Sequence, residues 1–197
     1  RERLLEFMDR EVVDYLVHLM RDRGIALRLG SEVETVRFTA DGTPVCILAD
    51  GRQTASEMVL FTSGRVGATA DLNLLACSLT TDKRGRLPVD PETFQTVQPH
   101  IYAAGDVIGF PSLASTSMEQ GRAAACHAFG QPLPRSNQAY PYGIYAVPEL
   151  SSVGLSEDDV RQRGIAYECG IARFRETSRG HIMGVETGML KLICARD

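Results

Sequence analysis

Apolar and polar positions along the chain follow two spacings, one helical and one typical of strands. From residue 4 to residue 20, apolar side chains recur every three or four positions, which predicts an amphipathic helix that ends at Gly24. Segments 33–38 and 45–48 are strand-like and flank an Asp-Gly pair, a sequence typical of a tight turn. They therefore predict a β-hairpin, and a second Asp-Gly pair at residues 50–51 predicts another turn.

Three short apolar runs predict strands of another kind, at residues 25–29, 58–62 and 100–104. The second and third contain few polar side chains, which is typical of strands buried on both faces of a sheet. Residues 112–129 predict a helix rich in small side chains, which allow close packing on such a sheet. Together these elements predict an α/β fold.

The composition changes at residues 130–143, which are rich in Pro, Gly and polar residues and predict a linker. We therefore divide the chain into three pieces, 1–66, 67–140 and 141–197. In the last piece, a Ser-Glu-Asp-Asp sequence predicts a helix capped by Ser156.

The rest of the last piece predicts two strands, near residues 168–174 and 189–193. Between them lie three glycines spaced four residues apart, Gly180, Gly184 and Gly188. Because their neighbours are strand-like, we interpret them as part of a hairpin rather than as a phosphate-binding loop.

The clearest candidate for a ligand site is Gly105-Asp106, which follows the predicted strand 100–104. A glycine lets a ligand approach the backbone, and the carboxylate can accept hydrogen bonds from sugar-type hydroxyls. Ligands of open α/β sheets bind beyond the carboxyl ends of strands, where this pair is expected. Taken alone, the pair favours an ordinary turn with a solvated Asp over a ligand site.

The next residues add the start of a helix. Pro111 precedes Ser112 and Ser115, and both serines suit an N-cap or the first helical turn. Free N–H groups there stabilise an anion, such as the negative charge of a reduced flavin. An ordinary capped helix is the alternative.

Gly64-Arg65 ends the predicted strand 58–62 in the same way. A dinucleotide could cross the sheet edge at Gly64, and Arg65 could pair with a carboxylate or a phosphate. A plain turn is the alternative. The chain has no Gly-x-Gly-x-x-Gly sequence, so any pyrophosphate loop lies outside it or no dinucleotide binds.

The remaining composition excludes several classes. A net charge of −4 without a basic stripe argues against a nucleic-acid partner, and no apolar run is long enough to cross a bilayer. The five cysteines and four histidines are scattered, so we predict neither a metal site nor a catalytic side chain. The odd, unpaired cysteines also indicate a reducing, cytoplasmic environment.

Three segments, residues 58–67, 98–124 and 142–160, resemble the flavoprotein disulfide reductase family in order and spacing. The resemblance implies a partial Rossmann-like fold of two dinucleotide-binding domains, followed by the start of an α+β interface domain. The pieces would be the end of the NAD(P)-binding domain, the central FAD-binding segment and the first part of the dimerisation domain. We expect the chain to be an internal part of a longer protein, inactive by itself.

The resemblance also implies residue roles. Asp106 would bind the ribityl chain of FAD, backbone N–H groups of residues 112–115 would face the flavin ring, and Gly64 would lie against the NAD(P) dinucleotide. Pro148-Glu149 would begin the interface domain of a homodimer. The residues expected to bind FAD are Gly105, Asp106, Ser112, Leu113, Ala114 and Ser115.

Within the family, residues 105–115 are most similar to members that transfer hydride from NADPH to NAD+ through FAD. Both NAD(H) and NADP(H) would then be substrates. A dithiol–disulfide oxidoreductase of the same family is the first alternative, and an upstream Cys-x4-Cys pair would favour it. A non-catalytic flavin- or nucleotide-binding module is the second.

Overall fold

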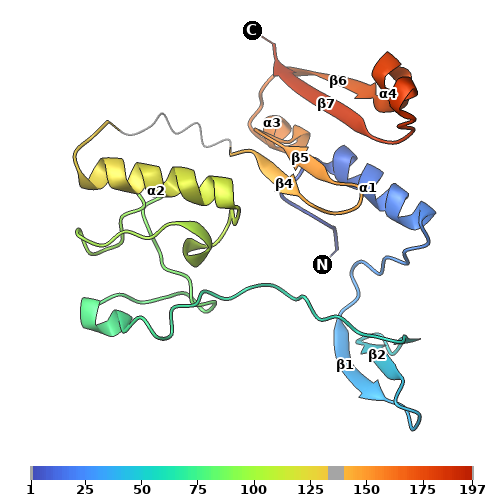
Figure 1. Ribbon diagram of the computed structural model, residues 1–197, viewed down its shortest axis with the longest axis horizontal. Coiled ribbons are helices and arrows are strands. Elements are labelled where there is room, and N and C mark those ends of the chain that lie inside the picture. The colour runs from blue at the N-terminus through green and yellow to red at the C-terminus, as the bar shows by residue number, and fades with distance from the viewer. Residues whose placement is uncertain (1, 133–139, 197) are drawn as a thin grey trace. The chain divides into compact units, whose positions relative to one another are not determined.

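The computed structural model describes residues 2–132 and 140–196 (Figure 1). They form two compact units, one made of residues 1–61 with 155–197 and the other of residues 62–154. Within the described ranges, no helix is both long and apolar enough to cross a membrane.

The first unit begins with helix α1 (Arg10–Asp22), which buries Val13, Leu16 and Leu19 on one face. The predicted helix is confirmed, but it starts six residues later than expected. The reason is Asp9, which has non-helical backbone angles and accepts a hydrogen bond from the Glu11 N–H at 3.1 Å.

A three-stranded antiparallel sheet follows in the order β1-β2-β3. Its strands are β1 (Val33–Phe38), β2 (Pro44–Leu48) and β3 (Gln53–Ala55), which confirms the predicted hairpin and the second turn. Gly51 in that turn has a φ of +83°, a conformation that side chains with a Cβ rarely adopt.

The rest of this unit is α3 (Glu157–Gln162), η3 (Phe174–Glu176), α4 (Ser178–Met183) and the antiparallel pair β6 (Tyr167–Arg173) and β7 (Met189–Ala195). Figure 1 shows β6 and β7 side by side in orange and red. The predicted strands and the Ser156 cap are confirmed, since Ser156 and Asp159 form a capping box.

The hairpin interpretation of the glycine-rich stretch is wrong at its centre. Gly180 lies inside α4, and Gly184 ends that helix with a φ of +65°. A Cβ on Gly180 would lie 1.8 Å from the backbone oxygen of Phe174, so only glycine fits this close approach.

The second unit contains η1 (Leu74–Cys77), η2 (Gly105–Ile108), α2 (Ala114–Ala128) and the short antiparallel pair β4 (Tyr142–Ile144) and β5 (Leu150–Ser152). Its apolar core is a small cluster around η2. The buried members are Leu79, Leu87 and Ala103, with Leu74, Val89, Ile101, Val107 and Ile108 packed against them.

The three strands predicted at residues 25–29, 58–62 and 100–104, of which the last two were expected to be buried, do not form. Residues 25–29 and 58–62 are irregular, and in 58–62 the side chains of Leu60 and Phe61 are 82% and 85% exposed. Residues 100–104 make a single bridge, from Tyr102 to Gln95. A parallel strand takes its hydrogen bonds from neighbouring strands, and no other described residues supply them. Of the predicted linker, residues 133–139 lie outside the described residues.

Candidate cofactor-binding site

The turn at Gly105 is fastened to α2. Gly105 is buried, has a φ of +81° and donates its N–H to Oε1 of Gln120 at 2.7 Å. A Cβ on Gly105 would lie 3.1 Å from Oγ of Ser117, which is tighter than ordinary contact. The positive φ favours glycine here, and a larger side chain would also crowd Ser117 of α2, against which η2 packs.

Asp106 is the next residue, and its side chain is 44% exposed. Nη2 of Arg65 lies 2.9 Å from its Oδ2, so of the two partners considered for Arg65 the structure shows the carboxylate. Gly64, beside it, has a φ of +89°. The structure thus brings the predicted Gly64-Arg65 and Gly105-Asp106 sequences together within one unit. Exposed pairs of this kind contribute about 0–1 kcal/mol, so the Asp106 carboxylate is accessible to another partner.

The start of α2 is open. Its N-cap is Leu113, and none of the described side chains makes a capping hydrogen bond there. The first three N–H groups of a helix have no partner within it, and Ser117 is the first shown to bond back, to the Leu113 oxygen at 2.9 Å. This end of α2 therefore presents donors and partial positive charge.

The two serines expected at this helix start differ. Ser115 lies in the first turn of α2, as predicted, whereas Ser112 precedes the helix and donates its hydroxyl to the Gly109 oxygen at 3.1 Å. Thr116, also in the first turn, is buried, and its Oγ1 has no hydrogen-bond partner among the described residues. The Thr116 hydroxyl in the first turn of α2 therefore has an unused hydrogen-bond donor among the described residues.

Two side chains near this edge were missed by the sequence analysis. Gln120 is 2% exposed and holds the Gly105 turn. Tyr142 stacks on Phe110 with ring centroids 5.2 Å apart. Burial, together with the negative charge of the nearby Asp106, raises the pKa of the Tyr142 phenol above its ordinary value. Both residues lie in segments that carry the family resemblance, but their partners are distant in sequence, so the sequence assigned them no role.

A separate charged cluster lies in the first unit, around Lys191 of β7. The Lys191 side chain is 3% exposed, and Nζ lies 2.9 Å from Asp9, 3.0 Å from Glu11 and 2.6 Å from Glu157. Burial works against the charge, but the hydrogen bonds to these carboxylates raise the pKa of Lys191 overall. A hydrogen bond from Lys191, joined by one from the Tyr167 hydroxyl, lowers the pKa of Glu157 to about 2. The cluster is closed and its groups satisfy one another.

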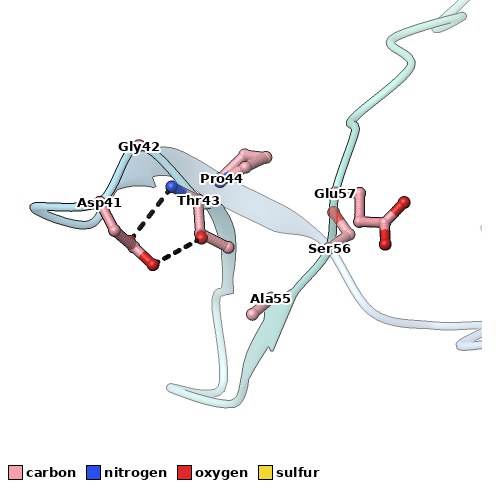
Figure 2. Close-up of a pocket in the computed structure, with 7 residues that line it drawn as sticks. All are labelled: Asp41, Gly42, Thr43, Pro44, Ala55, Ser56 and Glu57. Carbon is pink, nitrogen blue, oxygen red and sulfur yellow. Dashed lines mark hydrogen bonds between the residues drawn. The ribbon is translucent and has the colours of Figure 1, made fainter.

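Figure 2 shows a shallow pocket at the β1–β2 turn, where the carboxylate of Asp41 bonds the N–H and the hydroxyl of Thr43. The Asp41 carboxylate also accepts a hydrogen bond from the Thr39 hydroxyl. This bond, followed by those from Thr43, lowers the pKa of Asp41. The polar groups are used by the turn itself. The residues that line the pocket are Asp41, Gly42, Thr43, Pro44, Ala55, Ser56 and Glu57.

Comparison with known families places this geometry in a class. Residues 1–121 match the pyridine nucleotide-disulphide oxidoreductase profile, and residues 140–197 match the dimerisation domain of the same family. The chain belongs to the pyridine nucleotide-disulphide oxidoreductase family. The resemblance described from the sequence is therefore confirmed.

Among curated relatives, the chain is 47% identical to the soluble pyridine nucleotide transhydrogenase of Mycobacterium bovis. It is 41% identical to the protein of that name from a Marinomonas species and 39% identical to that of Yersinia enterocolitica. Each match covers 100% of this chain but 42% of the relative. The chain thus spans about two fifths of the length of these relatives.

Among solved structures, the fold is similar to LpdA from Mycobacterium tuberculosis, with a TM-score of 0.86 and 26% identity over 97% of this chain and 41% of that one. It is also similar to the HOCl-induced flavoprotein disulfide reductase RclA from Escherichia coli, with a TM-score of 0.82 and 26% identity over 96% of this chain and 43% of that one. The predicted class, a partial dinucleotide-binding α/β fold with a dimerisation domain, is confirmed.

Proposed function

We propose that this chain is part of a longer FAD-dependent oxidoreductase that transfers hydride between NADPH and NAD+. The observation that carries the proposal is the Gly105-Asp106 turn packed against the open start of α2, with Arg65 beside it. The 47% identity to a soluble pyridine nucleotide transhydrogenase supports this reaction over others in the family.

The residues present fit FAD. Gly105 lets a ligand approach the backbone, and the half-exposed Asp106 offers oxygen acceptors to ribityl hydroxyls. Leu113, Ala114 and Ser115 stand at the uncapped start of α2, where backbone N–H groups favour negative charge on a ring system placed against them. When bound, FAD supplies the hydride acceptor and donor.

In this proposal no side chain of the chain acts as an acid, base or nucleophile, because hydride passes between two ring systems. The protein binds, orients and stabilises charge. Gly64 lies against the nicotinamide dinucleotide, where its positive φ leaves the backbone accessible. The match to the dimerisation domain supports a homodimer, and five free cysteines are consistent with the reducing cytoplasm.

A dithiol–disulfide oxidoreductase is the second candidate, favoured by the structural similarity to the flavoprotein disulfide reductase RclA. That reaction requires a redox-active cysteine pair. The five cysteines of this chain are scattered and none has the Cys-x4-Cys spacing, so the pair would have to come from sequence outside it. A Cys-x4-Cys sequence upstream of Arg1 would decide for this candidate.

The test is to mix the purified full-length protein with NADPH and thio-NAD+ and follow the absorbance of reduced thio-NAD+. We expect turnover with a bound flavin that bleaches and recovers. Flavin reduction without hydride reaching the second nucleotide would overturn the proposal in favour of the disulfide reductase. A bound flavin that NADPH never bleaches would favour a binding module.

A further inference from the structure

The buried face of α2 is mostly polar. Its buried residues are Thr116, Gln120 and Ala124, spaced four positions apart, and Gln120 is 2% exposed. Burying a side-chain amide costs free energy unless its polar atoms are hydrogen-bonded. A helix that only had to pack could carry an apolar residue at position 120, so the buried amide indicates that a specific hydrogen bond is needed there.

The partner of that amide is the turn expected to bind the ribityl chain. Oε1 of Gln120 accepts the N–H of Gly105 at 2.7 Å, and the bond is buried. Because Gly105 is the first residue of η2, its N–H has no acceptor within that helical turn. Removing the Gln120 oxygen would leave a buried donor unpaired, which costs more than the loss of a solvated hydrogen bond.

This bond connects the two halves of the candidate cofactor site. Gly105 adjoins Asp106, which is expected to bind ribityl hydroxyls, whereas Gln120 lies in the helix whose start, at residues 113–115, is expected to face the ring. Along the chain, the two halves are joined through the irregular segment 109–113. Since a helix is stiff along its length, a turn fastened to Gln120 is held at a fixed distance from the first N–H groups of α2.

We propose that Gln120 is a positioning residue for the flavin, fixing the turn at Gly105 relative to the open start of α2. The proposal rests on the function proposed above, because it requires FAD at this edge. Groups that are fixed before the cofactor arrives need no ordering on binding, so FAD binds more tightly. The reduced flavin gains more than the oxidised one, because its negative charge depends on the N–H donors of α2.

The test uses the full-length, FAD-loaded protein and the variant Gln120→Leu, which fills similar space without an acceptor. We expect the dissociation constant of FAD to rise about tenfold, the effect of one buried donor left without its acceptor. The reduced flavin should lose more stabilisation than the oxidised flavin. A tenfold difference between the two corresponds to about 30 mV, so the two-electron midpoint potential should become more negative by up to about 30 mV.

Two further variants separate positioning from packing. Gln120→Asn keeps an amide but is one methylene shorter, which withdraws the oxygen from Gly105. It should shift the potential in the same direction, and it replaces Gln120→Leu if that variant does not fold. Gln120→Glu is the rescue, because burial favours its neutral form, whose carbonyl oxygen accepts as the amide does. Its FAD affinity should stay close to that of the wild type, and binding as weak as in Gln120→Leu would overturn the inference.

The matched control is Gln95→Leu, the same substitution in the same unit. Nε2 of Gln95 donates to the Pro99 oxygen at 2.8 Å and to the Tyr102 hydroxyl at 3.1 Å, both before the turn at Gly105. A loss of packing or stability alone would lower the urea midpoint in both variants and leave the potential unchanged. We expect a changed potential in Gln120→Leu and an unchanged one in Gln95→Leu, and equal shifts in both would contradict the role of Gln120.

The outcomes distinguish this proposal from the function on which it rests. If the wild-type protein binds no FAD, the proposed function fails. If it binds FAD and transfers hydride, but Gln120→Leu and Gln120→Asn match the wild type in affinity and potential, the role of Gln120 fails alone.

Discussion

Two carboxylates in this chain lie at the beginning of helical elements but differ in their exposure to solvent. Asp9 begins α1 and is 8% exposed; it accepts from the N–H of Glu11, from the N–H of Glu157 at 3.0 Å and from Lys191. Asp106 lies in η2 with its side chain 44% exposed and pairs with Arg65, which is 79% exposed. The first carboxylate is enclosed by its partners, whereas the second remains open to solvent.

This difference in exposure suits Asp9 to stabilising the fold and Asp106 to binding a ligand. Asp9 caps α1, and its other bonds reach α3 and β7, so it connects residues matched by the redox profile to residues matched by the dimerisation profile. In the Lys191 cluster, all three carboxylates pair with the buried ammonium of Lys191. Around Asp106 the donors of α2 and one carboxylate face solvent, which costs little and leaves them available to a ligand.

The largest effect should come from Lys191→Met. It removes the ammonium from three carboxylates and leaves buried Asp9 uncompensated, so we expect the free energy of unfolding to fall by about 3–5 kcal/mol. Urea unfolding of the full-length protein followed by circular dichroism measures this. The control is Arg196→Met, whose exposed partner is Glu168, and it should leave the midpoint unchanged. Equal midpoints for both variants would contradict the comparison.

Next in size is the loss of cofactor affinity in Asp106→Ala. Hydrogen bonds to a charged group contribute about 1.5–3 kcal/mol, so the dissociation constant of FAD should rise about 10- to 100-fold. Unfolding of the apo-protein should not change, because the carboxylate is half-exposed. Fluorescence titration with FAD and urea unfolding check the two halves. A large loss of apo stability with intact affinity would reverse the roles assigned here.

The same contrast explains what could be predicted from the sequence. The β1–β2 hairpin and the Ser156 capping box depend on residues within a few positions of each other, and both were predicted. The Gly105-Asp106 turn was also visible, because glycine and a carboxylate after an apolar run form a local pattern. Local patterns carry their own turn and cap chemistry.

Contacts between residues far apart in the sequence could not be predicted from such local patterns. Lys191 meets Asp9 across 182 positions, and nothing near either residue marks the other as a partner. Residues 58–62 have the composition of a buried strand, yet Phe61 is 85% exposed, because composition does not supply the neighbouring strand. Tyr142 was missed for the same reason, since its contact with Phe110 spans the predicted linker.

Acid should weaken the first unit through Glu157. Its pKa is about 2 in the folded protein, held down first by Lys191, against an ordinary value of about 4.3 when unfolded. The stabilisation is therefore complete above about pH 5 and is lost as the pH falls toward about 2. Urea midpoints measured from pH 7 to pH 3 should decline less steeply in Glu157→Gln than in the wild type. Parallel declines would mean that other carboxyls cause the loss.

The smallest effects should come from the helix caps, where the comparison can be tested in both directions. Oγ of Ser156 accepts from the Asp159 N–H at 3.2 Å, so Ser156→Ala should cost about 1 kcal/mol of stability without changing FAD affinity. Leu113→Ser would instead place a cap on the open start of α2 and occupy donors proposed to face the flavin. We expect weaker FAD binding with little change in the urea midpoint, measured by the same titration and unfolding curves. If Leu113→Ser binds FAD as tightly as the wild type, those donors do not contribute to binding, and the open start of α2 has no role in the site.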